Sequence, residues 1–141
     1  MTRSFTFALF AVLASASLAL AQPAPLEVVG LGGRCGSAQR GSAMAASSLT
    51  ARAATSGDVT IRLASFSFYC RPAPVFDAAL REDGAIVLTA REPEAPVARC
   101  TCPHDLRLRV RGVPPGTHAV EVRFRDEVRA RGEVTVPPPR R

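Results

Sequence analysis

The sequence contains no lysine, asparagine or tryptophan, and aromatic residues make up only 6% of its 141 residues. Without lysine, the chain has neither the phosphate-binding lysine of a P-loop nor an amine that could form a Schiff base. Without asparagine, it has no acceptor for N-linked glycosylation. The 18 basic residues are therefore all arginine, and against 12 acidic residues they give a formal net charge of +6. This charge permits attraction to polyanions without requiring it.

Signatures of catalysis and of cofactor binding are also missing. The G-x-S-x-G motif of a nucleophilic serine does not occur, and Gly30 and Gly32 lack the following helix and distal acidic residue of a dinucleotide-binding fingerprint. Cys35 would be a nucleophile only if His104 or His118 met it in space, and nothing in the sequence indicates this. We therefore predict no catalytic residue, no cofactor and no enzymatic activity.

The N-terminus has the composition of a secretory signal peptide. Residues 5–14 form an apolar run behind a single arginine, and small residues follow up to an A-x-A pattern that ends at Ala21. We predict a signal peptide over residues 1–21, a mature chain that begins at Gln22, and a secreted or periplasmic protein. A membrane anchor is the alternative, but the apolar run is short for the about 20 residues of a membrane span. No later segment is predicted to cross a membrane.

The first part of the mature chain, residues 22–57, is rich in glycine, alanine and serine, and we expect it to be partly irregular. Leu26–Val29 suits a first strand. We predict a loop at Gly30–Gly36, which is mostly glycine, because glycine loses the most backbone entropy in regular structure. Between residues 37 and 55 a short helix, a strand or a mobile segment all fit, and we predict a strand over Ser48–Ala54.

Residues 58–136 carry the clear strand signals and form the predicted core. Apolar and polar residues alternate over 59–63, and the apolar phase then shifts at Phe66, which indicates a β-bulge near Ala64 or Ser65. Further strands are predicted over Val75–Leu80, Ala85–Ala90, Val97–Cys102, Leu106–Val110, Val120–Phe124 and Val128–Val136. We expect Pro103 to end the strand before it and Asp105 to cap the turn that follows. Residues 137–141, which open with three prolines, are expected to form a disordered tail.

Short strands with turn signals about every 8–12 residues are typical of a β-sandwich or small barrel. The connections are too short for helical crossovers, so we predict that the strands pair antiparallel. Residues 113–122, V-P-P-G-T-H-A-V-E-V, resemble the L-x-P-G-x-Y-x-V-x-V stretch of bacterial immunoglobulin-like and fibronectin-type sandwiches. The resemblance implies an all-β, immunoglobulin-like antiparallel sandwich of about seven strands, in which His118 takes the place of a tyrosine that caps backbone groups. Cys100–Leu106, C-T-C-P-H-D-L, resembles a segment of small secreted bacterial proteins with no established activity.

Export and an even number of cysteines favour disulfide bonds, formed by Cys35, Cys70, Cys100 and Cys102. If Cys100 and Cys102 lie on one strand, their Cα atoms are about 6.6 Å apart, near the upper limit for a disulfide bond. Each should therefore pair with either Cys35 or Cys70, and both such pairings stay open. Either pairing would tie the segment 22–57 to the sandwich.

A soft metal site is the alternative use of these residues. Cys100, Cys102 and His104 share one face of an extended strand, and Cys70 could complete a ligand set suited to Zn²⁺ or Cu(I). However, C-x-C-x-H is not a standard zinc spacing, and an oxidising compartment competes for the thiols. We therefore predict disulfide bonds and no metal, and a periplasmic metal-binding protein is the alternative function.

Arg107, Arg109 and Arg111 project from one side of a predicted strand. If the next strand pairs with it, Arg123 joins the same face. Such a face could dock an acidic envelope polymer or an acidic protein, whereas nucleic acid is not expected because no aromatic residues interleave to stack on bases. The alternative is a solvated sheet face that only prevents edge pairing. We predict an exported, non-enzymatic binding or envelope-associated module whose ligand the sequence does not identify.

Overall fold

A computed structural model describes residues 24–36, 46–94, 96–97 and 99–139 of the chain. Its strands are β1 (Ala24–Cys35), β2 (Ser48–Ala53), β3 (Val59–Tyr69), β4 (Phe76–Leu80), β5 (Ile86–Ala90), β6 (Thr101–Arg111), β7 (Gly116–Phe124) and β8 (Glu127–Val136). The all-β prediction is confirmed, with eight strands rather than about seven. The predicted signal peptide, residues 1–21, and its cleavage site lie outside the described residues.

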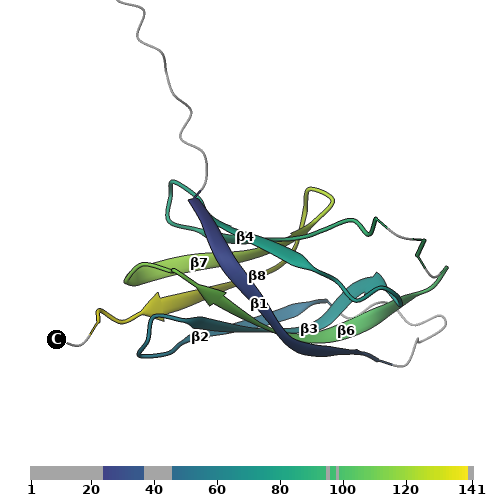
Figure 1. The fold of residues 1–141 in the computed structure, drawn as a ribbon, viewed down its shortest axis with the longest axis horizontal. Helices are drawn as coiled ribbons and strands as arrows, with labels where there is room; N and C mark the ends of the chain where they lie inside the picture. The colour runs from purple at the N-terminus through teal and green to yellow at the C-terminus, as the bar shows by residue number, and fades with distance from the viewer. Residues whose placement is uncertain (1–23, 37–45, 95, 98, 140–141) are drawn as a thin grey trace, which may run out of the picture.

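The strands form one curled sheet in the order β2-β3-β6-β1-β4-β5-β7-β8. β1 joins the two halves of this sheet, because Ala24–Leu26 pair with β4 and Glu27–Cys35 pair with β6. Figure 1 shows β2, β3 and β6 in one layer, β4, β7 and β8 in the other, and β1 running diagonally between them. The two ends of the order also meet, since Leu49 of β2 packs against Gly132 of β8. The sheet is therefore nearly closed around an apolar core.

A β-bulge in β3 turns its apolar side chains inward on both sides of the bulge. The register of β3 against β6 shifts between Leu63 and Phe66, and Ser65 has a positive φ of 58°. The bulge predicted near Ala64 or Ser65 is confirmed. The backbone amide of Ser65 donates a hydrogen bond to Oδ1 of Asp105, at 3.0 Å. Asp105 thus supports the bulge from within β6, and the prediction that it caps a turn is wrong.

β6 runs through Pro103, so the prediction that this proline ends a strand is wrong. Of the strand predicted over Val97–Cys102, only the last two residues belong to β6. Pro103 lies opposite Ser67 of β3, and its carbonyl oxygen accepts a hydrogen bond from the amide of Gly36, at 2.7 Å. Proline removes a donor from a strand but keeps its acceptor, and here the acceptor is used.

The glycine-rich stretch 30–36 belongs to β1 as far as Cys35, so the loop predicted there is wrong. The strand contains an irregularity in register at Gly32, whose φ is 118°. At Gly33, which lies opposite Leu106 of β6, a Cβ atom would lie 3.1 Å from the backbone carbonyl oxygen of Asp105 and would overlap the Cδ2 atom of Leu106. The close approach of two paired backbones, which glycine permits, therefore outweighs the entropy cost on which we based the loop.

One strand pair is parallel, contrary to the prediction that all strands pair antiparallel. β5 and β7 run in the same direction, with Ile86 opposite Val120. β6 connects them in sequence but belongs to the other half of the sheet. A strand of the opposite layer thus supplies the crossover for which we had assumed a helix. The other strand pairs of the described chain are antiparallel, as predicted.

The N-terminal segment 22–57 contributes β1 and β2 to the sheet, and β2 corresponds to the strand predicted over Ser48–Ala54. At the other end, residues 137–139 follow β8 and belong to no strand, and residues 140–141 lie outside the described part. Within the residues that the structure describes, no helix has the length and apolar character that a membrane span requires.

Replacing Gly33 by alanine should lower the free energy of unfolding by about 1–3 kcal/mol, because the new methyl group overpacks the contact between β1 and β6. Gly30→Ala is the matched control on the same strand, since a Cβ atom there has nothing within 4 Å. It should change stability by less than about 0.5 kcal/mol. Urea denaturation followed by circular dichroism measures both, and equal losses would contradict the described pairing.

Candidate functional site

Two disulfide bonds join Cys35 to Cys102 and Cys70 to Cys100, with Cα atoms 5.8 and 5.6 Å apart. No cysteine is free in the part of the chain that the structure describes, which includes all four. The prediction of disulfide bonds is confirmed, and the structure selects one of the two pairings left open. The first bond joins the end of β1 to β6. The second joins the residue that follows β3 to the residue that precedes β6, and β4 and β5 lie between these two residues in sequence.

His104 lies against the first disulfide bond. Its Nε2 atom is 3.3 Å from Sγ of Cys102 and 2.8 Å from the carbonyl oxygen of Tyr69. The histidine is only 3% exposed, and its ring meets that of Phe68 edge to face, with 6.2 Å between the ring centroids. The Nε2 atom of this buried histidine thus lies within reach of both a backbone carbonyl oxygen and a disulfide sulfur.

The metal site that we considered as an alternative has a different composition in the structure. The ligand atoms of Cys35, Cys102 and His104 lie within 4.8 Å of one another. Cys70 and Cys100, which we had placed in this set, are bonded to each other instead. While both disulfide bonds hold, none of the four sulfur atoms is the thiolate that a soft metal ion requires.

An arginine cluster, consisting of Arg52, Arg62, Arg107 and Arg109, lies on the outer face of β2, β3 and β6. Arg62 of β3 lies directly opposite Arg107 of β6. In the neighbouring row, Thr60 lies between Arg52 of β2 and Arg109 of β6. Because the residues that alternate with these arginines are buried or half-buried in the core, the arginine side chains point outward.

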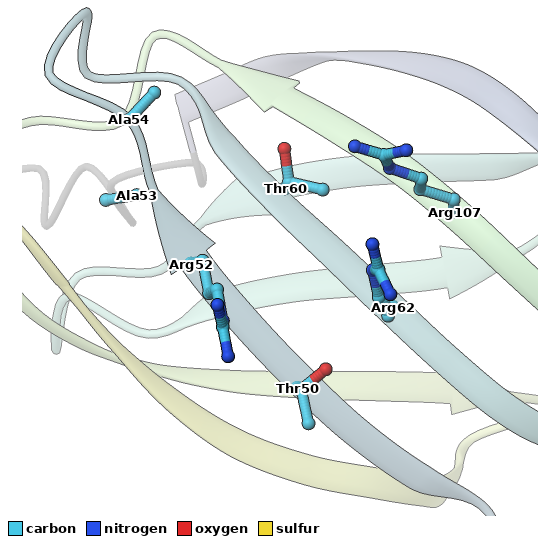
Figure 2. Close-up of a pocket in the computed structure, with 7 residues that line it drawn as sticks. All are labelled: Thr50, Arg52, Ala53, Ala54, Thr60, Arg62 and Arg107. Atoms are coloured by element: carbon cyan, nitrogen blue, oxygen red, sulfur yellow. The ribbon is translucent and has the colours of Figure 1, made fainter.

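Three arginines of the cluster line a shallow groove of about 420 Å³. The remaining lining residues are small, and no carboxylate is among them: Thr50, Ala53, Ala54 and Thr60. Figure 2 shows the guanidinium groups of Arg52, Arg62 and Arg107 beside the two threonine hydroxyl groups along the three strands. The groove thus offers cationic donors and neutral hydroxyl groups to whatever lies in it.

The arginine cluster has no carboxylate partner among the residues that the structure describes. Arginines elsewhere on the strands do have one: Arg111 is 3.2 Å from Glu27, and Arg129 is 2.9 Å from Glu127. Like charges directly opposite on neighbouring strands destabilise a sheet. The juxtaposition of Arg62 with Arg107 therefore costs stability, and among the described residues neither arginine forms an ion pair that would offset this cost. Asp105, the one acidic residue of β6, accepts a hydrogen bond from the Ser65 amide instead.

Arg123 does not belong to this face, although we predicted one surface of Arg107, Arg109, Arg111 and Arg123. It lies on β7, whose neighbours are β5 and β8, whereas β6 pairs with β3 and β1. The prediction was wrong because it assumed that consecutive strands pair. The guanidinium group of Arg123 is 2.8 Å from Glu121, and this hydrogen bond lowers the pKa of the glutamate carboxyl. Arg123 is therefore neutralised locally.

We did not predict that Arg52 and Arg62 share a surface with Arg107. Both alternate with apolar residues in the sequence, which is a signal that they point outward. The order of the strands, which brings β3 between β2 and β6, is not encoded in that local pattern.

His118 is buried and connects two turns. Its Nδ1 atom is 2.8 Å from the carbonyl oxygen of Gly84, and its Nε2 atom is 2.9 Å from that of Pro114. The implied role of His118 in capping backbone groups is confirmed. A neutral imidazole has one N–H group and donates to one of these carbonyls, whereas the doubly protonated ring donates to both. His118 thus links the turn at Gly84 to the turn at Pro114.

Comparisons with known proteins add no assignment to this geometry. No family model matches the chain, no curated protein matches its sequence, and no solved structure matches its fold. The candidate sites are the arginine cluster and the disulfide bond beside His104.

The disulfide pairing can be tested with the variant Cys35→Ser, which should leave Cys102 as the free thiol. Because Cys100 and Cys102 lie on one tryptic peptide, residues 100–107, the alkylated residue must be located by fragmentation between them. Alkylation of native protein followed by tandem mass spectrometry should find the label on Cys102. A label on Cys100 would show the other pairing.

Replacing His118 by phenylalanine should lower the free energy of unfolding by about 1–3 kcal/mol, because the ring no longer supplies an N–H group to the part-buried carbonyl groups of Gly84 and Pro114. His118→Gln keeps an N–H donor and should lose less. Urea denaturation of both variants gives the comparison. A His118→Phe protein as stable as the wild type would refute the capping role.

Proposed function

We propose that this protein is an exported, non-enzymatic binding module that holds an acidic polysaccharide of the cell envelope on the arginine cluster. The observation that carries the proposal is the placement of Arg62 directly opposite Arg107, with no ion pair to either among the described residues and no carboxylate lining the groove. An arrangement that costs stability is explained if an external anion supplies the missing countercharge. A polymer with repeated anionic groups can do so for several arginines at once.

The dimensions of the sheet suit such a polymer. Outward residues on one strand recur about every 6.6–6.8 Å, and neighbouring strands lie about 4.8 Å apart. The cluster therefore presents guanidinium groups at repeated short intervals along and across the strands. Each guanidinium group can donate two parallel hydrogen bonds to one carboxylate. The hydroxyl groups of Thr50 and Thr60 in the same groove can pair with sugar hydroxyl groups.

Other anionic partners fit the groove less well. A protein partner is usually held by an apolar centre with aromatic side chains, but the apolar residues of this groove are Ala53 and Ala54. A single-stranded nucleic acid would need aromatic side chains on which its bases stack, and none lines the groove. A sugar polymer needs neither, because charge and hydroxyl groups cover its surface.

Two parts of the proposal rest mainly on the sequence. Export is supported by the composition of residues 1–21 and is compatible with the two disulfide bonds. An immunoglobulin-like fold is supported by residues 113–122 and by the capping contacts of His118. The parallel pair β5–β7 departs from an all-antiparallel sandwich, so the proposed relationship concerns the layered architecture rather than the strand order.

The test compares retention on immobilised polygalacturonate, a polymer with one carboxylate per sugar. The variant R52Q/R62Q/R107Q should bind about tenfold more weakly or worse, because charge-assisted hydrogen bonds are lost. Wild-type binding should weaken steeply with salt, since exposed charges are screened over about 8 Å at physiological ionic strength.

The matched control is R81Q/R125Q/R129Q, which removes the same charge from arginines paired with carboxylates. This control should still bind, whereas the cluster variant should be no less stable than the wild type, because the opposition of Arg62 and Arg107 is relieved. Equal retention of all three proteins would reject the proposal. Binding to lipopolysaccharide but not to polygalacturonate would reject the polysaccharide as the ligand.

A further inference from the structure

We propose that the Cys35–Cys102 bond is a thiol–disulfide exchange site that accepts two electrons from an accessible dithiol. The two sulfur atoms of this bond are unequal, since Cys35 is exposed and Cys102 is only 1% exposed. An attacking thiolate can therefore reach Sγ of Cys35, and Cys102 must be the leaving group. This inference is independent of anion binding by the arginine cluster.

His104 is placed to stabilise that leaving group. The carbonyl oxygen of Tyr69 can only accept a hydrogen bond, so the Nε2 atom of His104, 2.8 Å away, carries a hydrogen. The same N–H group lies 3.3 Å from Sγ of Cys102. A thiolate is a much stronger acceptor than a disulfide sulfur, so this contact strengthens as negative charge develops on Cys102. His104 is a positioning residue in this scheme and transfers no proton.

The exchange proceeds in two balanced steps. First, a thiolate of the dithiol attacks Sγ of Cys35, the Cys35–Cys102 bond breaks, and Cys102 leaves as a thiolate. Second, the other thiolate of the donor attacks its own sulfur in the mixed disulfide, which releases Cys35 as a thiolate. The donor is oxidised to a disulfide, two electrons pass to the protein, and the two thiol protons reach Cys35 and Cys102 through water.

The second disulfide bond is an internal control. Cys100 is exposed and Cys70 is half-buried, so both of its sulfur-bearing residues are partly accessible. The chain has only two histidines. His104 contacts Cys102, and His118 contacts the carbonyl oxygens of Gly84 and Pro114. Among the described contacts, neither histidine touches the Cys70–Cys100 bond. Exposure alone thus favours attack on both bonds, whereas stabilisation of the leaving group favours Cys35–Cys102.

The experiment measures the reduction of each bond in the folded full-length protein by dithiothreitol. Aliquots are quenched by alkylation and the labelled cysteines are identified by mass spectrometry, while circular dichroism reports whether the fold persists. Cys35 and Cys102 should become labelled about tenfold faster than Cys70 and Cys100. His104→Phe should remove most of this difference without changing the rate at Cys70–Cys100. His104→Gln, which keeps an N–H donor, should restore part of it.

Three outcomes would overturn the exchange site. The first is equal reduction of both bonds, or faster reduction of Cys70–Cys100, in the wild-type protein. The second is reduction of Cys35–Cys102 only when the circular dichroism signal is lost. The third is an unchanged difference in His104→Phe, which would show that His104 does not stabilise the leaving thiolate of Cys102. Because the rate at Cys70–Cys100 is recorded in the same sample, a general loosening of the His104→Phe fold would accelerate both bonds and count against the proposal.

Discussion

The pairing of β6 between β3 and β1 is the constraint on which the rest of this structure depends. Side chains along β6 alternate between the two faces of the sheet, which places Cys102, His104 and Leu106 in the core. The same alternation turns Arg107 and Arg109 outward. A shift of one residue in this register would bury the arginines and expose the apolar side chains, so the burial of the core fixes it. Both candidate sites therefore follow from one strand, the disulfide site from its inner face and the arginine cluster from its outer face.

The core that β6 helps to build also explains why the unfavourable pairing of Arg62 with Arg107 can persist on the surface. The core that β6 helps to build is continuous from Val59 and Ile61 of β3 to Val120 and Val122 of β7, and all four are fully buried. Burying one such side chain contributes about 1.5–3 kcal/mol, whereas a like-charge pair across two strands costs at most about 1 kcal/mol. The fold can therefore tolerate Arg62 opposite Arg107, and a ligand can use their charge.

The sequence predicted what depends on neighbouring residues and failed where distant backbones meet. Alternation over residues 59–63 and 120–124 predicted buried faces correctly, and the phase shift before Phe66 located the bulge. We predicted a loop from the glycines over residues 30–36 because the entropy cost of glycine can be estimated from the local sequence. The close approach to β6 that glycine permits depends on a distant strand and cannot. The wrong placement of Arg123 and the parallel pair β5–β7 share one cause, which is that the crossover through β6 separates strands that are close in sequence.

We propose that the register of β3 against β6 creates an anion site from arginines that form no ion pair with any described carboxylate. Nuclear magnetic resonance of the arginine Nε–H groups, during titration with oligogalacturonate, tests it at single residues. We predict saturable shifts at Arg52, Arg62, Arg107 and Arg109, and much smaller ones at Arg81 and Arg123, which already pair with carboxylates. Shifts of equal size at all exposed arginines, or shifts that do not saturate, would contradict a specific site.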